Sequence, residues 1–324
     1  GWTGIPLGKM LRDEIDTVQR LPALLGERVL GQDHALQEIG KRIKISRARM
    51  EDPNKPIGVF LLLGPSGVGK TETALALADT LYGGERNLIT INMSEYQEAH
   101  TVSSLKGSPP GYVGYGEGGV LTEAVRRKPY SVVLLDEVEK AHPDVLELFF
   151  QVFDKGVLDD GEGREINFRN TVIILTSNTG TEHIMQACLN AGQQPTPDEI
   201  VEGLREELNQ VFKPAFLGRL TVVPYYPVKD AILERIVALK LERIRQRFER
   251  NHQAVLSYDA ALVKAIAARC TEVDSGARNI DNILSKTLMP ELAQQVLERM
   301  AQDTPIQSLH IEMDSDGDFA CRLS

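Results

Sequence analysis

The fold is decided by the stretch Gly64-Pro65-Ser66-Gly67-Val68-Gly69-Lys70-Thr71, which follows an apolar run over residues 57–63. Its spacing matches G-x-x-x-x-G-K-[ST], the pattern of a phosphate-binding loop between a strand and a helix. The glycines let the backbone turn tightly, so that successive N–H groups point inward at phosphate oxygens. The N-terminus of the following helix adds the positive end of its dipole. The stretch therefore predicts a nucleotide-binding loop.

Three residues close this loop at the start of the predicted helix: Lys70, Thr71 and Glu72. A lysine at this position reaches the β- and γ-phosphates, and the adjoining threonine hydroxyl ligates Mg²⁺. We therefore expect the chain to bind ATP together with Mg²⁺, and we place Glu72 among the ATP-binding residues.

Short apolar runs alternate with helical patterns on both sides of the loop. Near-continuous apolar runs are typical of strands buried on both faces of a parallel sheet. Because strands and helices alternate, we predict an α/β domain in which helices flank a parallel sheet. The predicted strands are 57–63, 88–93, 131–136, 171–177 and 220–224, and the clearest helices are 71–82 and 138–154.

Two acids end the third of these runs, Val132–Leu135. The first, Asp136, can hold the Mg²⁺ shell, because the carboxyl ends of parallel strands meet at one edge of the sheet. Glu137 is then placed to accept a proton from the attacking water, which favours hydrolysis over nucleotide binding alone. The next strand delivers Asn178 to the same edge, where its amide can orient the water or contact the γ-phosphate.

After residue 226 the pattern changes from alternating to mostly helical. Apolar residues recur at spacings of three and four from residue 228, Pro290 interrupts the last helical stretch, and the tail alternates around an acidic turn. We therefore expect a large α/β domain over 1–226 and a small helical domain over 227–324. The elements expected in the small domain are helices 228–250, 259–270 and 277–300 and a hairpin at 308–323.

The composition is that of a globular protein of a reducing cytosol. The chain has 324 residues, enough for two domains. No apolar run approaches the length of a membrane span, and residues 1–6 lack the features of a secretory signal. Three scattered cysteines fit a reducing compartment. The net charge of −10 argues against nucleic acid as a partner, because nucleic-acid-binding proteins usually carry a basic face.

Between the second and third predicted strands lies Gly111-Tyr112-Val113-Gly114, an aromatic residue on a glycine-flanked loop. Such a loop offers apolar contact with little sequence preference. Together with the motifs above, it makes the whole chain resemble the AAA+ ATPases of the Clp family. The resemblance implies a homo-hexamer in which this loop lines a central pore and grips a threaded polypeptide. It also implies that the small domain is a lid.

Two arginines resemble motifs through which the family couples hydrolysis to assembly. Arg219 ends Phe216-Leu217-Gly218-Arg219, which is similar to the arginine-finger segment, so it is implied to reach the γ-phosphate held by a neighbouring subunit. Arg278 ends Ser275-Gly276-Ala277-Arg278, which resembles the motif that opens a lid helix. That likeness implies that Arg278 senses the γ-phosphate and links it to the lid.

Further segments match the family in position. Val29 and Leu30 resemble the part that packs against adenine. Residues 160–163, Asp-Gly-Glu-Gly, fall where the family carries a second pore loop, and a solvated hairpin tip explains them equally well. Residues 2–6 are similar to the junction between the two ATPase modules of double-ring members. The chain is therefore interpreted as a C-terminal module without its N-terminal domain and first ATPase module.

Shorter phrases favour one branch of the family. Protease-coupled members carry an I-G-[FL] tripeptide, which residues 181–199 lack. The phrases at 104–110, 147–156 and 277–284 resemble the ClpV (TssH) branch, which recycles the contracted sheath of bacterial type VI secretion. This resemblance implies sheath proteins as the substrate. A general protein disaggregase of the ClpB kind is the alternative.

Three classes of function are therefore compared. The leading hypothesis is an ATP-driven polypeptide translocase. A nucleic-acid loader or helicase should show a basic pore, which the aromatic loop and the acidic balance disfavour. A nucleotide-gated binding platform would use ATP only to set its assembly state, and steady ATP turnover would exclude it.

Overall fold

The structure is a computed structural model that describes residues 7–189, 193–271, 277–314 and 318–323. Contacts within the chain divide it into two compact units. The first comprises residues 1–65 and 69–226, and the second comprises residues 66–68 and 227–324. The first six residues, similar in sequence to an inter-module junction, and the pair Ser275-Gly276 lie outside the described residues.

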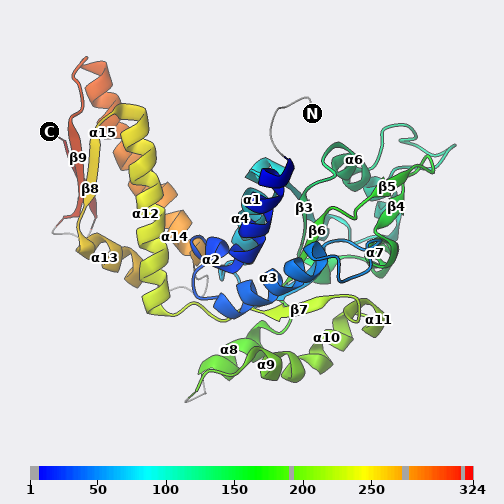
Figure 1. Ribbon diagram of the computed structural model, residues 1–324. Helices are drawn as coiled ribbons and strands as arrows, with labels where there is room; N and C mark the ends of the chain where they lie inside the picture. The colour runs from blue at the N-terminus through cyan, green and yellow to red at the C-terminus, as the bar shows by residue number, and fades with distance from the viewer. Residues whose placement is uncertain (1–6, 190–192, 272–276, 315–317, 324) are drawn as a thin grey trace. The chain divides into compact units, whose positions relative to one another are not determined.

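A five-stranded sheet forms the centre of the first unit (Figure 1). Its strands are parallel throughout and lie in the order β2-β3-β6-β1-β7. This arrangement confirms the predicted α/β class and all five predicted strands, each within a residue of its expected ends. The strands are β1 (Gly58–Leu63), β2 (Leu88–Asn92), β3 (Val132–Asp136), β6 (Val172–Ser177) and β7 (Thr221–Pro224).

Helices flank this sheet, and a short hairpin projects from it (Figure 1). The helices are α1 (Leu7–Gln19), α2 (Leu21–Gly26), α3 (Asp33–Arg47), α4 (Lys70–Tyr82), α5 (Val102–Lys106), α6 (Val120–Arg127), α7 (Pro143–Lys155), α8 (Thr181–Leu189), α9 (Pro197–Gly203), α10 (Arg205–Val211) and α11 (Pro214–Leu217). Single 3₁₀ turns occupy Glu85–Asn87, Met93–Glu95, Ala99–Thr101 and Val138–Lys140. The hairpin strands are β4 (Val157–Asp159) and β5 (Glu165–Asn167).

The predicted helix over 138–154 is wrong in its first turn. Val138–Lys140 forms a separate 3₁₀ turn, and α7 begins only at Pro143. A proline disfavours helical backbone in the residue before it, and His142 is accordingly extended. The imidazole Nδ1 of His142 accepts a hydrogen bond from the Asp144 N–H and caps the new helix. The break matters because it separates the acids after β3 from α7.

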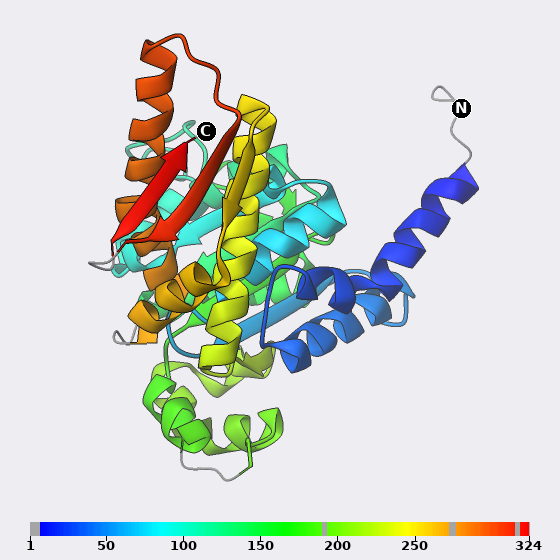
Figure 2. The ribbon, with the colours of Figure 1, turned by 90° about the vertical axis from the view of Figure 1, so that its left-hand side faces the viewer.

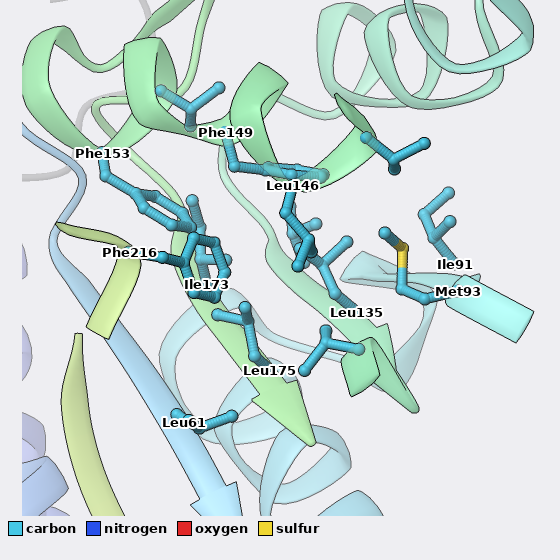
Figure 3. Close-up of a cluster of buried hydrophobic side chains, with 14 of the residues drawn as sticks. Leu61, Ile91, Met93, Leu135, Leu146, Phe149, Phe153, Ile173, Leu175 and Phe216 are labelled. Carbon is cyan, nitrogen blue, oxygen red and sulfur yellow. The ribbon is translucent and has the colours of Figure 1, made fainter. Parts of the chain in front are cut away.

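The core of the first unit lies between the sheet and α7 (Figure 3). Leu146 and Phe149 of α7 lie over Leu135 and Ile173 of the sheet, and Phe153 lies beside Phe216 of α11. Val133 and Leu135 of β3 and Ile173 and Leu175 of β6 are buried in the same cluster as the apolar side chains of α7, so α7 is held rigidly against the strands next to the predicted catalytic acids.

Replacing Phe149 with alanine should destabilise the protein by about 3–5 kcal/mol, because the side chain is fully buried and its removal leaves a cavity under α7. Urea unfolding followed by circular dichroism measures this cost. Leu189→Ala is the control: that side chain is 75% exposed, and its loss should change the free energy of unfolding by less than about 0.5 kcal/mol. A Phe149→Ala cost as small as the control's would contradict this packing.

The second unit combines helices with a three-stranded sheet (Figure 2). The hairpin predicted at 308–323 is confirmed, and Pro290 stands in the first turn of α15, directly after a π-helical segment, Leu284–Leu288. The third strand, β8, was not predicted, because four residues carry little pattern and their partner β9 is distant in sequence. The elements are α12 (Asp230–His252), β8 (Val255–Tyr258), α13 (Ala260–Thr271), α14 (Ala277–Ile283), α15 (Met289–Ala301), β9 (Ser308–Met313) and β10 (Phe319–Leu323).

Candidate nucleotide site

The phosphate loop leaves β1 and enters α4, as its spacing predicted. Gly69 has φ of 109° at the N-cap of α4, a conformation that L side chains rarely adopt. The Nζ of Lys70 donates to the carbonyl oxygens of Gly64 and Pro65, the latter at 2.9 Å. The lysine therefore lies along its own loop, and the exposed Thr71 begins α4 beside it.

The segment before α3 packs on this loop. Val29 is buried, and its Cγ1 lies 3.2 Å from where a Cβ on Gly69 would stand. Leu30 is partly buried. Arg28 donates from Nε to Glu72 Oε1 at 3.0 Å and from Nη2 to Glu85 Oε1 at 2.7 Å. Burial opposes the charge of Arg28, but Glu72 and Glu85 outweigh it and raise its pKa. Glu72 thus ties the Val29 segment to α4.

The carboxyl ends of β3 and β6 lie side by side, so the acids after β3 meet polar residues of β6 (Figure 1). The hydroxyl of the buried Thr176 donates to Asp136 Oδ1. The Glu137 N–H in turn donates to Thr176 Oγ1 at 3.2 Å. Thr176 therefore orients the carboxylate of Asp136 and the backbone of Glu137 together.

Glu137 itself has an unusual backbone. Its φ of 58° and ψ of 49° lie in the left-handed region, which is strained for a residue with a Cβ. Such strain is frequent at functional sites. Its Oε2 accepts a hydrogen bond from Lys140 Nζ at 2.9 Å, and this bond raises the pKa of Lys140. The ammonium of Lys140, three residues further along the chain, therefore holds the carboxylate of Glu137, the predicted base.

Asn178 joins the two halves of the site. Its Oδ1 accepts from Lys70 Nζ at 3.1 Å, and its backbone N–H donates to Glu139 Oε1 at 3.2 Å. Lys70 begins α4 and Asn178 follows β6, 108 residues further along the chain. Three of the four predicted catalytic residues thus lie at one sheet edge: Lys70 contacts Asn178, and Glu137 follows the neighbouring strand β3, which ends at Asp136.

The oxygen donors at this edge suit Mg²⁺. Proteins bind this ion through one or two carboxylates, with phosphates and water supplying the other ligands. Asp136 offers a carboxylate that Thr176 orients, and Thr71 offers an exposed hydroxyl at the start of α4. Both residues proposed to hold the metal therefore fit its chemistry.

The aromatic loop lies between α5 and α6. Its Tyr112 is 71% exposed and Val113 is fully exposed, which is unusual for two large apolar side chains in sequence. Gly111 and Gly114 on either side have φ of 91° and 84°, so the loop needs glycine at both positions. The loop accordingly presents two apolar side chains to solvent on a backbone of tight turns.

Residues 160–163 form the tip of the β4–β5 hairpin. Asp160 is buried and accepts from the backbone N–H groups of Glu162 and Arg164 and from Arg164 Nε, the last at 2.7 Å. Burial opposes ionisation of Asp160, but these hydrogen bonds outweigh it and lower its pKa. Asp160 therefore shapes the turn, and only Glu162 and Gly163 are exposed. The Gly161 N–H donates to Lys106 O at 2.9 Å, which joins this tip to the base of the aromatic loop.

The predicted finger, Arg219, follows α11 and is not part of this cluster. It is exposed and pairs with Asp154 at the end of α7. Arg278 stands in the first turn of α14, in the second unit, and is exposed.

Four residues around the site were not predicted: Arg28, Glu139, Lys140 and Thr176. Each acts by supporting a predicted residue through a hydrogen bond or ion pair. Lys140 carries a detectable signal, because a lysine three residues after an acid in a helical turn faces it. Arg28 and Glu72 are 44 residues apart, and no spacing pattern in the sequence predicts such a contact.

Two family models together match most of the chain. Residues 55–223 match the AAA domain (Cdc48 subfamily). Residues 229–310 match the C-terminal, D2-small domain of ClpB protein. None of the helices in the described residues is long and apolar enough to cross a membrane.

Curated relatives are similar over nearly all of the chain. A protein of Pseudomonas aeruginosa named AAA+ ATPase ClpV1 is 60% identical over 96% of this chain and 34% of its own length. Proteins named Chaperone protein ClpB are 58% identical in Yersinia enterocolitica and 47% identical in Meiothermus ruber. Both match 91% of this chain, over 33% and 34% of their own lengths. The chain therefore spans about a third of the length of the relatives it matches.

Proposed function

From the premise that the chain belongs to the AAA family, in its Cdc48 subfamily, and is a nucleotide-binding ATPase, we propose that it is a polypeptide-threading module of a Clp-type ring. The observation that carries the proposal is that one unit holds both the contact of Lys70 with Asn178, next to the acids at the end of β3, and an exposed aromatic loop. We further propose that residues 1–226 and 227–324 are its large and small domains, as the two family matches support.

Hydrolysis is assigned to the edge formed by β1, β3 and β6. The backbone N–H groups within residues 64–69 bind the phosphates. When ATP binds, Lys70 replaces its hydrogen bonds to the loop carbonyls with hydrogen bonds to β- and γ-phosphate oxygens. Thr71 and Asp136 would hold Mg²⁺, which when bound would supply positive charge to neutralise those phosphates. Glu137 accepts the proton of the attacking water, and Asn178 orients that water or the γ-phosphate. Val29 and Leu30 contact adenine.

Assembly completes each site. In a ring of six chains, Arg219 approaches the γ-phosphate bound by the adjacent chain and stabilises the charge of the transition state. Its exposure and its ion pair with Asp154, which is not part of the cluster around Lys70, support a role outside its own site. Arg278 of the small domain senses the γ-phosphate and couples its presence to movement of that domain, which acts as the lid. The exposed place of Arg278 at the start of α14 permits this role.

Threading is assigned to Tyr112 and Val113, which present apolar surface that fits polypeptides of any sequence. Tyr112→Ala should leave ATP turnover within about twofold of wild type, since the residue lies outside the hydrolysis site, and should weaken ATP-dependent binding of a polypeptide by about tenfold, as expected when a central aromatic anchor is lost. Fluorescence anisotropy with fluorescein-labelled casein measures this binding.

The matched control is Tyr130→Ala, which also removes a largely exposed tyrosine, at 60%. Tyr130 precedes β3, at the end of that strand away from Asp136 and Glu137. Its casein binding should equal that of the wild type. Equal binding by the Tyr112 and wild-type chains would refute the threading role of the loop. Binding that is lost in both tyrosine variants would mean that casein adheres to exposed aromatic surface in general.

For the substrate, we propose the contracted type VI sheath, on the ClpV resemblance and the 60% identity to a protein named ClpV1. General disaggregation is the second candidate, because the small domain matches a ClpB model and one protein named ClpB is 58% identical. A whole-protein assay with purified contracted sheath and with heat-aggregated luciferase separates them, and release of sheath alone supports the first.

The partners and compartment follow from the same proposal. N-terminal and first ATPase modules of a longer protein would join this chain, since its relatives are about three times as long. Neither nucleic acid nor a membrane is proposed as a partner. The bacterial cytoplasm is the proposed compartment, and the free thiols of Cys188, Cys270 and Cys321 fit its reducing conditions.

A further inference from the structure

We propose that Asp154 is the positioning residue of the arginine finger: it holds the Arg219 guanidinium in the orientation needed to meet the phosphate of an adjacent chain. The inference rests on the proposed function, because it gives Arg219 the role assigned there. Arg219 is exposed, yet its guanidinium is held by Asp154, Ala215 and Phe150 of its own chain.

The two side chains form a bidentate pair. Arg219 Nε donates to Asp154 Oδ1 and Nη2 donates to Oδ2, each at 2.9 Å. Parallel bonds of this kind fix the plane of the guanidinium as well as its position. The hydrogen bond with Asp154 also raises the pKa of Arg219, so the guanidinium stays charged.

Two further contacts lock the same group. Nη1 donates to the carbonyl of Ala215 at 2.6 Å, and the guanidinium carbon lies 4.8 Å from the centre of the Phe150 ring. A guanidinium stacked on an aromatic face gains cation–π attraction and cannot rotate freely. Phe150 and Asp154 are one turn apart on α7, the helix packed on the strands that carry the catalytic acids. The finger is thus anchored to a rigid element of its own chain.

These contacts do not use every N–H group of the Arg219 guanidinium. A guanidinium has five N–H groups. The contacts with Asp154 and Ala215 use one on Nε, one on Nη2 and one on Nη1. One N–H on each terminal nitrogen is left outside these bonds. Each of these two groups can donate a charge-assisted hydrogen bond to a phosphate oxygen.

Because Arg219 is anchored in advance, less side-chain conformational entropy is lost when it reaches the phosphate in the transition state. A free arginine would lose its rotamer freedom on reaching the phosphate, whereas this one has already been ordered by Asp154, Ala215 and Phe150. The acid carries one opposing effect, since its charge partly offsets that of Arg219. We infer that orientation outweighs this offset, because Asp154 engages only Nε and Nη2 and one N–H on each terminal nitrogen is left for the ligand.

The test is a double-mutant cycle on steady-state ATP turnover, measured at a chain concentration where specific activity has reached its plateau. Asp154→Ala should lower kcat by about ten- to hundredfold, the cost of a misplaced reacting group. KM for ATP should stay within about twofold, since the finger acts in the transition state. In an Arg219→Ala chain, adding Asp154→Ala should cause no further loss. Asp154→Asn, which keeps one acceptor oxygen, should give an intermediate kcat.

Glu147→Ala is the matched control. Glu147 also lies on α7 and forms an ion pair with Lys213, so its loss breaks another α7 ion pair to the segment before α11 without touching Arg219. Its kcat should equal that of the wild type. A loss as large as that of Asp154→Ala would reveal general loosening of α7 and would overturn the proposal.

The remaining outcomes separate this inference from the proposed function. Turnover at or above the wild-type level in both Asp154 variants, while Arg219→Ala is impaired, overturns the positioning role and leaves the finger standing. A full Asp154→Ala loss that persists in the Arg219→Ala background assigns Asp154 to structure and also overturns it. Wild-type turnover in Arg219→Ala contradicts the finger itself, and the positioning role falls with it.

Discussion

Glu137→Gln should lower ATP turnover by about 10²- to 10⁴-fold, the range that general acid–base catalysis contributes, and should leave nucleotide affinity within about twofold. The amide cannot take the proton of the attacking water. Glutamine has nearly the shape of glutamate and can still accept a hydrogen bond from Lys140 through its carbonyl oxygen. The phosphate loop and Lys70 are untouched, and so binding should persist.

Two measurements separate these effects: phosphate release gives turnover, and the fluorescence of a methylanthraniloyl ATP analogue gives affinity. Glu206→Gln, the same change at an exposed glutamate of α10, serves as the control and should retain full turnover. Unchanged turnover in Glu137→Gln would remove Glu137 from the mechanism. Loss of nucleotide binding would instead mean that the strained backbone at residue 137 supports the phosphate loop.

Arg219→Ala should lower turnover by about 10³-fold, the lower end of what an arginine finger supplied by a neighbour contributes. Nucleotide affinity should change little, because Arg219 is absent from the cluster of Lys70, Asn178 and the acids after β3. The wild-type chain should also show specific activity that rises with concentration, since each site needs an adjacent chain.

Light scattering alongside the rate measurement shows whether activity follows assembly into rings of six. Mixing the variant with Glu137→Gln chains adds a direct test: two inactive variants should regain part of the activity, because a Glu137→Gln neighbour can supply Arg219 to an intact base. Arg205→Ala, an exposed arginine of α10, is the control. Turnover that is independent of concentration and of Arg219 would mean that each chain works alone.

The sequence predicted the elements that carry chemistry because their signals are local. The phosphate loop is eight consecutive residues, and each strand is a continuous apolar run between turn residues, so both appear without knowledge of distant contacts. The helix over 138–154 was mispredicted at its start, because apolar spacing continued through Pro143, whose backbone restriction ends the earlier turn.

The sequence by itself thus determined the α/β class, the parallel strands and the chemical identity of the side chains proposed to be catalytic. Only the tertiary structure decided which distant partners hold them: Thr176 on Asp136, Glu139 on Asn178 and Asp154 on Arg219. The physical reason is that a hydrogen bond or ion pair needs two side chains within about 3 Å. Arg219 and Asp154 are 65 residues apart, and only the packing of α7 and α11 brings them to that distance.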